Sequence, residues 1–239
     1  MAFLTPDRAY TEYGLVIKEK LITAKSGVKM YSGKKLNTKG NKPEYITIHN
    51  TEDINEAAGT NDAEQYSRAT YNNNMGDVVV HYYIDETDCW HILGDDTVGW
   101  HAADGSTGTG NTKSVAIEII MDGSGKDYDV KAEQRGALLA AILLHKYGLG
   151  IDKLKTHRDW YGKKYCPTYI LPHWDKFKAQ VEKNLADIKK QDEAAAQKTE
   201  PAVKKHYRVQ VGYYAVKKNA EAMQKKLKDA GFSAIIKEE

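Results

Sequence analysis

The sequence is poor in cysteine and in long apolar runs, and each scarcity excludes a class of protein. Two cysteines among 239 residues cannot build a disulfide framework, which favours synthesis in the reducing cytosol. No stretch approaches 18 consecutive apolar residues, so we expect no membrane-spanning helix. The first residues, MAFLTPDRAYTEYGLVIKEK, hold no apolar segment of the length that a secretory signal needs. What remains is an ordinary globular composition, with 41% hydrophobic and 28% charged residues.

Phenylalanine is also scarce, with 3 residues against 16 tyrosines. Tyrosine carries a polar tip on an aromatic ring, which suits wet clefts and sugar-rich ligands. A tyrosine-rich core explains the same counts, so both interpretations stay open at this stage.

Charge is distributed unevenly along the chain. The net charge is +2, but residues 178–239 hold 14 Lys and Arg against 9 Asp and Glu, and are therefore +5, which leaves residues 1–177 at −3. A basic tail on a mildly acidic body indicates attraction to an anionic surface. A solvated helical face would have the same composition.

Strand and helix patterns alternate through the first 200 residues. EYITIHN alternates β-branched residues as a strand does, and SVAIEIIM is almost wholly apolar, as in a strand buried on both faces. Gly148 follows a helical pattern where a C′ glycine belongs. Alternation of this kind predicts an α/β body with a central sheet and flanking helices. We expect strands at 44–50, 76–86 and 114–121, and helices at 62–73, 132–147 and 171–197.

The C-terminal segment predicts a small separate module. Residues 199–205, TEPAVKK, are typical of a linker because of their proline and charge. The remainder, 206–239, predicts a strand, a helix with Ala220, Met223 and Leu227 on one face, and a second strand. We therefore expect a compact βαβ unit after the linker.

His157 and Cys166 lie nine residues apart, in THRDWYGKKYC. On one helix they would occupy opposite faces, and on one strand they would be on the order of 30 Å apart. They meet only if the chain doubles back, for which Gly162 and Pro167 supply the turn chemistry. His49 closes the predicted strand 44–50, where ligands of open α/β sheets gather.

Two imidazoles and one thiolate suit Zn²⁺ in tetrahedral geometry. Three protein ligands leave the fourth position for water, which is the arrangement of a catalytic rather than a structural zinc site. A lone histidine at position 49 is more often structural, and the second histidine and the cysteine are what favour a metal. We predict one catalytic zinc ion, held by His49, His157 and Cys166.

Glu118 is a carboxylate inside the apolar segment VAIEII. Burying a carboxylate costs several kcal/mol unless it is paired or used. A buried salt bridge is one interpretation. The other, which we favour, is a general base beside a metal-activated water.

Three further residues near these motifs are candidates. Lys164 precedes Cys166 by two residues, so in an extended segment both project to the same side, where an ammonium could stabilise an oxyanion. His101, in GWHAADG, lies at the mouth of a glycine-rich loop and could hydrogen-bond substrate, and Trp100 could supply an apolar wall. A surface lysine is the alternative for Lys164, and Lys163 is interpreted that way.

A second metal-binding pair, Cys89 and His91 in DCWH, lacks two further ligands. We therefore interpret Cys89 as an ordinary half-buried thiol. The remaining histidines are predicted not to bind metal: His81, His91, His145, His173 and His206.

Six segments occur in a fixed order, namely EYITIHNT, HYYID, GWHAADG, GNTKSVAIEI, THRDW and KYCPTYIL. Together they resemble the zinc-dependent N-acetylmuramoyl-L-alanine amidases of the amidase_2 type, with phage and prophage endolysins of Gram-positive bacteria the most similar in style. The resemblance covers about residues 25–185 and extends in fold to peptidoglycan recognition proteins. It implies a central mixed β-sheet flanked by helices.

The resemblance assigns roles to the same residues. His49, His157 and Cys166 match the zinc ligands, and Glu118 matches the catalytic glutamate. Lys164 matches the lysine beside the metal, although the extra residue in YGKKYC leaves a choice between it and Lys163. Some relatives have a catalytic tyrosine at the position of Val80, so its absence here implies that Glu118 carries more of the proton transfer.

The C-terminal segment resembles about half of a SPOR (sporulation-related) domain, a family that binds peptidoglycan glycans. A βαβ unit of about 35 residues rarely buries enough surface to stand alone, so we predict self-association through 207–239. The expected domains are an N-terminal extension at 1–24, the catalytic domain at 25–185, a charged helix and linker at 186–206, and the SPOR-like half-domain at 207–239.

The implied reaction is hydrolysis of the amide between N-acetylmuramic acid and the L-alanine of the stem peptide, with the Gram-positive cell wall as substrate. Glu118 would move the water's proton to the leaving amine, while Lys164 and His101 stabilise the oxyanion. Two alternatives remain: a non-lytic peptidoglycan-binding protein, and a cytosolic enzyme that recycles soluble muropeptides. A lysin made without a signal peptide would reach the wall after release, through a holin pore if phage-encoded. No nucleic-acid partner is expected.

Overall fold

The computed structural model describes residues 3–23, 30–31, 34–35, 39–52, 62–76, 78–199 and 209–238. The chain divides into two compact units, residues 1–196 and 197–239, and each is described by itself. Among the described residues, no helix has the length and apolar character needed to cross a bilayer.

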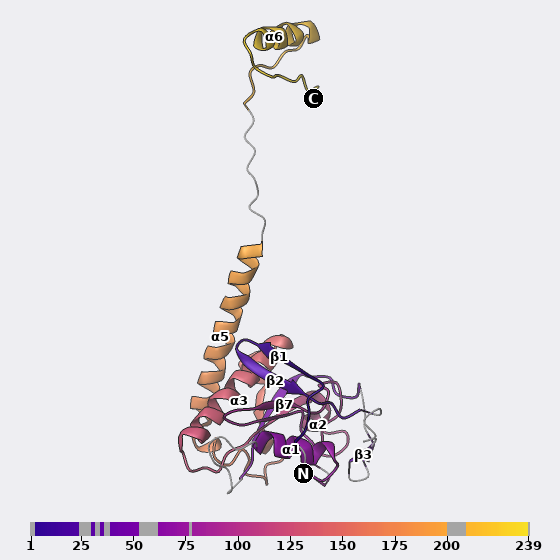
Figure 1. Cartoon of the computed structure of the whole chain (residues 1–239), viewed down its shortest axis with the longest axis vertical. Coiled ribbons are helices and arrows are strands. Elements are labelled where there is room, and N and C mark those ends of the chain that lie inside the picture. The colour runs from indigo at the N-terminus through magenta and orange to yellow at the C-terminus, as the bar shows by residue number, and fades with distance from the viewer. Residues whose placement is uncertain are drawn as a thin grey trace. The chain divides into compact units, whose positions relative to one another are not determined.

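The first unit is built on a seven-stranded mixed sheet (Figure 1) with the strand order β1-β2-β7-β6-β8-β5-β9. Toward one edge, β5 lies between β8 and the edge strand β9, and β8 also pairs with β6; all three pairings are parallel. A separate two-stranded ribbon pairs β3 with β4. The strands are β1 (Arg8–Glu12), β2 (Leu15–Glu19), β3 (Met30–Tyr31), β4 (Lys34–Lys35), β5 (Tyr45–Asn50), β6 (Tyr82–Ile84), β7 (Cys89–His91), β8 (Ser114–Ile119) and β9 (Leu154–Thr156).

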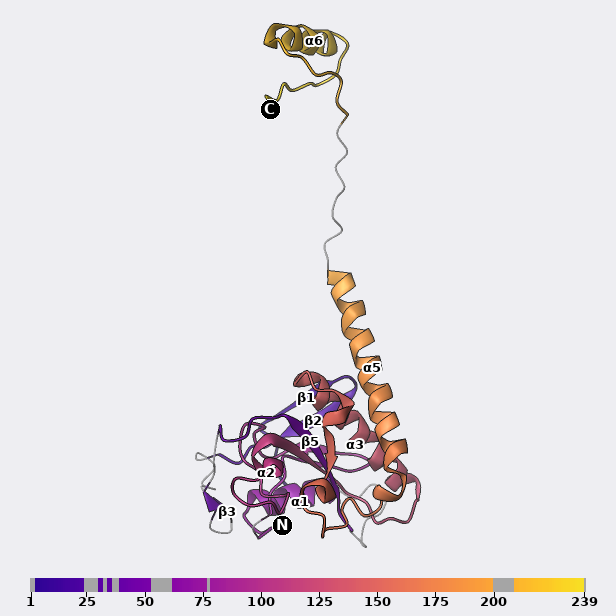
Figure 2. The same ribbon diagram turned by 180° about the vertical axis from the view of Figure 1, so that it is seen from behind.

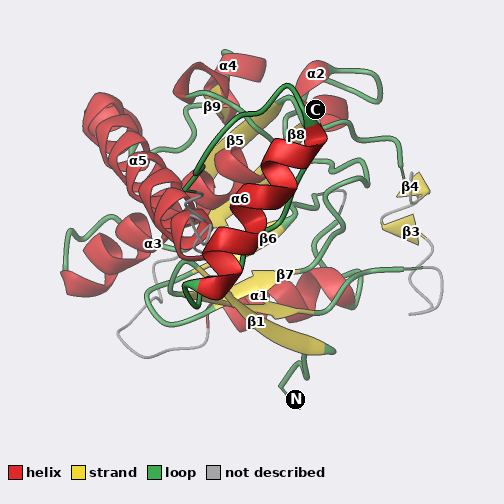
Figure 3. Ribbon diagram, turned by 90° about the horizontal axis from the view of Figure 1, so that it is seen from above, coloured by secondary structure: helices red, strands yellow, loops and turns green. Residues whose placement is uncertain are grey.

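Helices cover the sheet on both sides. Figures 1 and 2 show α5 running beside α3, and Figure 3 shows α1, α3 and α5 around the strands. Two short 3₁₀ turns, Ile151–Lys153 and Leu171–His173, connect elements late in this unit. The helices are α1 (Asp62–Tyr71), α2 (Thr109–Lys113), α3 (Asp127–Lys146), α4 (His157–Trp160), α5 (Trp174–Thr199) and α6 (Lys217–Asp229).

Strand β8 separates two apolar clusters, because its side chains alternate between them. Ile117 and Ile119 belong to the larger cluster, with residues of α3 and α5 such as Leu143. Ala116 and Ile120 belong to the smaller one on the opposite face. The sequence-based prediction of a strand buried on both faces is confirmed, and Glu118 projects to the side of the smaller cluster.

Helix α3 ends as the sequence predicts. Gly148 has a positive φ of 63°, its N–H donates to the carbonyl of His145, and the N–H of Leu149 donates to the carbonyl of Leu144. These two bonds form a Schellman motif, in which glycine takes the left-handed position without steric cost.

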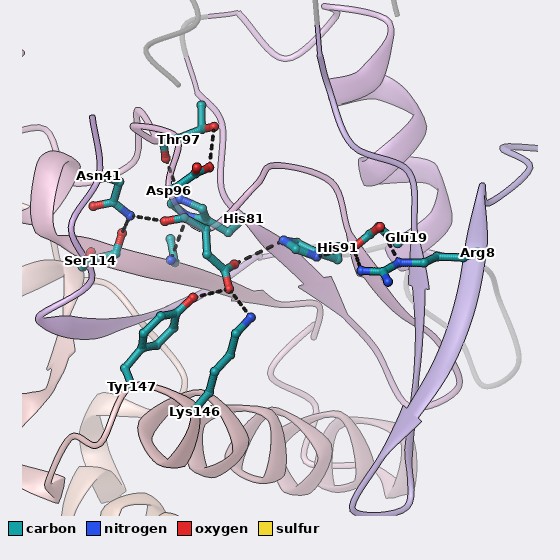
Figure 4. Close-up of polar contacts among 12 residues, drawn as sticks. Arg8, Glu19, Asn41, His81, His91, Asp96, Thr97, Ser114, Lys146 and Tyr147 are labelled. Atoms are coloured by element: carbon teal, nitrogen blue, oxygen red, sulfur yellow. Dashed lines mark hydrogen bonds and ion pairs between the residues drawn. The ribbon is translucent and has the colours of Figure 1, made fainter. Parts of the chain in front are cut away.

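The N-terminal segment is part of the sheet rather than an appendage. Strand β1 pairs antiparallel with β2, and β2 pairs in parallel with β7. Glu19 at the end of β2 lies 3.1 Å from Nδ1 of His91, whose Nε2 lies 3.2 Å from Asp95 (Figure 4). Lys146, at the end of α3, is 2.8 Å from the same aspartate. Ionic contacts therefore attach the β1–β2 hairpin to β7 and α3. The sequence patterns did not predict this role.

The strand expected at 76–86 is shorter than predicted. Only β6, Tyr82–Ile84, forms a ladder, and Val79 makes an isolated bridge with Trp100. Between them, the ring of His81 accepts the N–H of Ala116, so a side chain replaces a backbone partner there. The apolar run indicated burial correctly, but a regular ladder was the wrong expectation.

The second unit contains the predicted helix but not the predicted strands. Helix α6 spans Lys217–Asp229, and the described residues on either side, 209–216 and 230–238, form no strand (Figure 1). Their apolar side chains have no sheet to cover: Val209 is 86% exposed and Ile235 87%. A strand needs a neighbouring strand for its hydrogen bonds, and this unit supplies none among those residues.

Candidate metal centre and active site

The parallel strands β8, β5 and β9, at one side of the sheet, carry the predicted residues to one place. His49 on β5 is the register partner of Glu118 on β8, so their side chains share a face. On the other side of β5, strand β9 ends at Thr156 and His157 follows at once. Chain segments more than 100 residues apart are thus joined by strand pairing.

A capping box fixes the direction of His157. The hydroxyl of Thr156 accepts the N–H of Asp159 at 3.1 Å, and the carboxylate of Asp159 accepts the N–H of Thr156 at 2.7 Å. This pattern starts α4, so His157 stands in the first turn of a helix that begins where β9 ends.

The loop after α4 doubles back, as predicted. The N–H of Arg158 donates to the carbonyl of Cys166 at 3.1 Å, which returns the thiol to the start of the helix. Nδ1 of His49 then lies 3.6 Å from Sγ of Cys166. The three donor atoms of His49, His157 and Cys166 lie within 4.8 Å of one another.

These distances fit a tetrahedral metal ion. Zn–S bonds of about 2.3 Å and Zn–N bonds of about 2.0–2.1 Å at a tetrahedral angle separate sulfur and nitrogen by about 3.6 Å. That is the separation of Cys166 and His49. Nε2 of His157 is buried and has no hydrogen-bond partner, whereas the ring donates a hydrogen bond to the backbone carbonyl of Ala102, which must therefore come from Nδ1. A buried ring nitrogen without a hydrogen-bond partner, in a residue whose donor atom lies within 4.8 Å of the other two, is what a metal site requires.

Burial sets the protonation of the ligand groups. It raises the pKa of Cys166 to about 12, an effect that the N–H of Asn50 and the charge of Lys164 reduce. It lowers the pKa of His157 to about 4 and that of His49 well below the ordinary value. The imidazoles are therefore neutral and ready to coordinate, and a bound cation would compensate a thiolate at position 166.

Glu118 is partly exposed beside these ligands. Burial raises its pKa to about 8, and the positive charge of Lys164 acts in the opposite direction. A cation held by the three ligands would favour the carboxylate further. A carboxyl group poised near neutrality suits proton transfer.

Lys164 is the lysine of the adjacent pair that faces the cluster. Its charge lowers the pKa of Glu118, His49 and His157. Lys163 and Lys164 are both exposed, so exposure does not distinguish them. The backbone N–H of Lys164 donates to the carbonyl of Tyr161, which holds the turn that presents it.

His101 and Trp100 have surroundings that the sequence did not suggest. Nδ1 of His101 lies 3.0 Å from Nε2 of His49, and the residue is only 5% exposed, so its polar contacts are within the protein. Trp100 is half-buried against the smaller apolar cluster. Val80, at the position of a tyrosine in some relatives, is fully buried in that cluster and brings no hydroxyl group.

The other histidines have partners outside the cluster. His81 and His91 are held as described above, His145 lies 2.7 Å from Asp192, and His173 lies 2.9 Å from Glu133. Cys89 is fully buried rather than half-buried, and burial raises the pKa of its thiol. His206 lies outside the described residues.

Sequence reasoning missed the polar residues behind the ligands. Trp160 Nε1 donates to Thr47 Oγ1 at 2.9 Å, and Thr47 donates to Ser114 Oγ at 2.8 Å. Asn111 accepts the backbone N–H groups of both His101 and Ala102 through Oδ1. Strand alternation puts Thr47 on the same face of β5 as His49, but only the fold brings α2 and α4 against it.

The family model for N-acetylmuramoyl-L-alanine amidase (Amidase_2) matches residues 39–169, more than half of the chain. The chain belongs to this amidase family. The model spans all three candidate ligands together with Glu118 and Lys164, and the resemblance drawn from the six sequence segments is confirmed.

Curated relatives of this chain include amidases of Bacillus. The chain is 38% identical over 145 residues to N-acetylmuramoyl-L-alanine amidase XlyB of Bacillus subtilis, covering 59% of this chain and 43% of the relative. It is 36% identical over 150 residues to the amidase CwlA of the same organism, covering 62% and 52%. The chain thus spans about half the length of the curated relatives it matches.

Solved structures agree with the fold. The catalytic domain of XlyA superposes with a TM-score of 0.57 at 32% identity, covering 70% of this chain and 98% of that one. The PlyG catalytic domain gives a TM-score of 0.59 at 29% identity, covering 71% and 94%. The predicted mixed sheet with flanking helices is therefore confirmed as the architecture of amidase catalytic domains.

A SPOR domain model matches residues 177–238 of the chain. The match starts within α5 and includes α6, so it is longer than the segment 207–239 that the sequence pattern indicated. The resemblance of the tail to this family is confirmed.

Proposed function

We propose that this chain is a zinc-dependent peptidoglycan hydrolase that cleaves the amide bond between N-acetylmuramic acid and L-alanine. The observation that carries the proposal is the convergence of His49, His157 and Cys166 beside Glu118 on the neighbouring strand. The family match and the relatives named amidases support the reaction class.

The metal would be held by Nδ1 of His49, Nε2 of His157 and Sγ of Cys166. Bound zinc supplies Lewis acidity, which polarises a carbonyl and acidifies a water. A ligand set with one negative charge leaves that ion net positive, which favours both effects.

Two side chains would transfer the proton and stabilise the negative charge of the intermediate. Glu118 accepts a proton from the attacking water and returns it to the leaving amine, since its pKa is raised toward neutrality by burial. Lys164 stabilises the oxyanion that develops on the scissile carbonyl, because its charge already acts on this cluster. The buried Val80 offers no hydroxyl for either task.

The tail would bind peptidoglycan and keep the enzyme on its polymeric substrate. The SPOR match and the excess of basic residues in 178–239 support this role. A tether raises the local concentration of substrate for the catalytic unit. The enzyme would be made in the cytoplasm and act on the wall after release, through a holin pore if phage-encoded.

The decisive experiment treats isolated Gram-positive walls with the purified chain, with and without a chelator. We expect new N-terminal alanine, no new reducing ends, loss of activity in chelator and recovery with added zinc. Undiminished activity after complete metal removal would refute zinc dependence, and release of reducing sugars alone would refute the amidase reaction.

The same assay separates the two alternatives. A non-lytic binding protein would sediment with walls and release no alanine. A recycling enzyme would prefer free muropeptides to intact walls, whereas a tethered hydrolase prefers walls. The complete set of ligands favours the enzyme over the binding protein, because a receptor has no need for a reactive metal.

A further inference from the structure

His101 uses both ring nitrogens inside the protein. Nδ1 lies 3.0 Å from Nε2 of His49, and the two rings meet edge to face with centroids 5.1 Å apart. The other nitrogen, Nε2, lies 3.4 Å from Oγ of Ser114, whose hydroxyl is bonded to the carbonyl of Gly110. His101 therefore stands between a metal ligand and the start of α2.

The partners of Nε2 determine where the proton of His101 resides. Ser114 Oγ donates its only proton to the carbonyl of Gly110 at 2.6 Å, so toward Nε2 of His101 it can act only as an acceptor. Nε2 of His101 must therefore be the donor. A neutral imidazole has one donor and one acceptor nitrogen. Nδ1 of His101 therefore accepts a hydrogen bond from the Nε2–H group of His49. Nδ1 of His49 is then left with a free lone pair, and it is the nitrogen 3.6 Å from Cys166 Sγ.

The surrounding structure makes this arrangement rigid. Gly110 approaches so closely that a Cβ there would lie 2.4 Å from Cβ of Ala102 and 2.7 Å from Cγ of Trp160. The hydroxyl of Ser114 is held in turn by Thr47, which donates to it at 2.8 Å. Asn111 fixes the backbone of His101 by accepting its N–H at 2.9 Å. Elements α2, β5 and β8 thus hold one tautomer of one histidine.

We propose that His101 is a positioning residue that fixes the tautomer of His49, with the carbonyl of Gly110 as the origin of the chain of hydrogen bonds. It acts through His49 on the metal rather than on the substrate. This role rests on the proposed function, because it presumes a metal at the three ligands, and it replaces the substrate contact that the sequence suggested for His101.

Histidine ¹⁵N NMR of the zinc-loaded protein tests the tautomers directly. We expect His49 to be protonated on Nε2 and coordinated through Nδ1, and His101 to be neutral with its proton on Nε2. A proton on Nδ1 of His101, or coordination of His49 through Nε2, overturns the proposal. The measurement requires no catalytic activity.

Zinc affinity of variants provides the second test, measured by competition with a chromophoric chelator. His101→Phe keeps an aromatic ring but removes the acceptor, so zinc should bind about 10–100-fold more weakly. His101→Asn returns an oxygen acceptor near the position of Nδ1 and should recover most of the affinity. His173→Gln is the matched control, because that histidine pairs with Glu133 at the surface, and its zinc affinity should equal that of the unmodified chain.

Thermal unfolding in chelator shows whether each variant is folded before zinc is added. A folded His101→Phe variant with unchanged affinity overturns the proposal, and the tautomer measurement on the unmodified chain decides if that variant does not fold. Failure of the proposed function is a separate result: the unmodified chain would release no N-terminal alanine from walls, while its tautomers and zinc affinity would still be measured.

Discussion

Glu118 sits one strand away from a metal ligand and should be removable without loss of the metal, because it is not among the three donors. We expect Glu118→Gln to bind zinc as the unmodified chain does and to lose about 10²–10⁴-fold in wall hydrolysis. Zinc content and alanine release, measured on the same preparation, check this. Glu44→Gln is a suitable control, since Glu44 forms an exposed pair with Lys113. Full wall-lytic activity in a zinc-loaded Glu118→Gln variant would exclude Glu118 as the base.

Lys163 and Lys164 are adjacent and both exposed. The charge that lowers the pKa of Glu118 is that of Lys164. Lys164→Ala should lower kcat by about 10²-fold, as removal of one oxyanion donor does elsewhere, with little change in KM. Lys163→Ala should leave both constants unchanged. Steady-state kinetics on a soluble muropeptide check this pair, and equal losses in the two variants would contradict the assignment.

At the scale of elements, ionic contacts attach the hairpin β1–β2 to β7 and α3 (Figure 4). Contacts with Asp95 and Glu19 raise the pKa of His91 against the opposing effect of burial. The contact with His91 lowers the pKa of Glu19 to about 2, and that of Asp95 is also lowered, although burial opposes both shifts. The carboxylates contribute stability above their unfolded values of 4.5 and 3.8, and lose it as pH falls. His91 contributes fully below 6.5 and loses its contribution as pH rises through its folded pKa.

We therefore expect His91→Gln to reduce the free energy of unfolding most between about pH 4.5 and pH 6.5, by roughly 2 kcal/mol, because each carboxylate loses one cationic partner and keeps only Arg8 or Lys146. The reduction should shrink above the folded pKa of His91, where the unmodified chain has lost the same charge. Urea unfolding as a function of pH measures this. His173→Gln serves as the control, since its partly exposed pair with Glu133 should contribute less than about 1 kcal/mol. A loss that is constant from pH 5 to pH 9 would contradict an ionic origin.

At the scale of the whole molecule, the two compact units allow the catalytic and tail functions to be separated. A chain ending at residue 196 should fold and hydrolyse soluble muropeptides at the rate of the full chain, but should be retained less on walls.

The tail also has apolar side chains that are more than 60% exposed, namely Val209, Tyr213, Phe232 and Ile235. We expect these residues to drive self-association of the full chain, which the chain ending at residue 196 should lack. Light scattering and wall sedimentation measure both properties, and a monomeric full chain would contradict the self-association.

Local pattern predicted the elements where one periodicity dominated. Strand β8 was evident from its apolar run, and the end of α3 from Gly148, because burial on two faces and the left-handed conformation restrict residue choice. The ladder at 76–86 was overpredicted, since side-chain hydrogen bonds of His81 replace part of it. The tail strands were overpredicted for a related reason: β-propensity describes a surface that fits a neighbour, and it does not supply one.

The sequence by itself determined the donor types, the carboxylate within an apolar strand and the order of the motifs, because these depend on residue chemistry and local spacing. It could indicate that His157 and Cys166 meet through a turn. Only the tertiary structure decided that His49 and Glu118 are register partners and that the charge of Lys164 acts on Glu118. It also decided that His101 contacts the metal-binding residue His49. The order of the parallel strands and the packing of α2 against β5 are contacts between segments far apart in the sequence. No local pattern contains them, because contacts across the sheet depend on which strands pair.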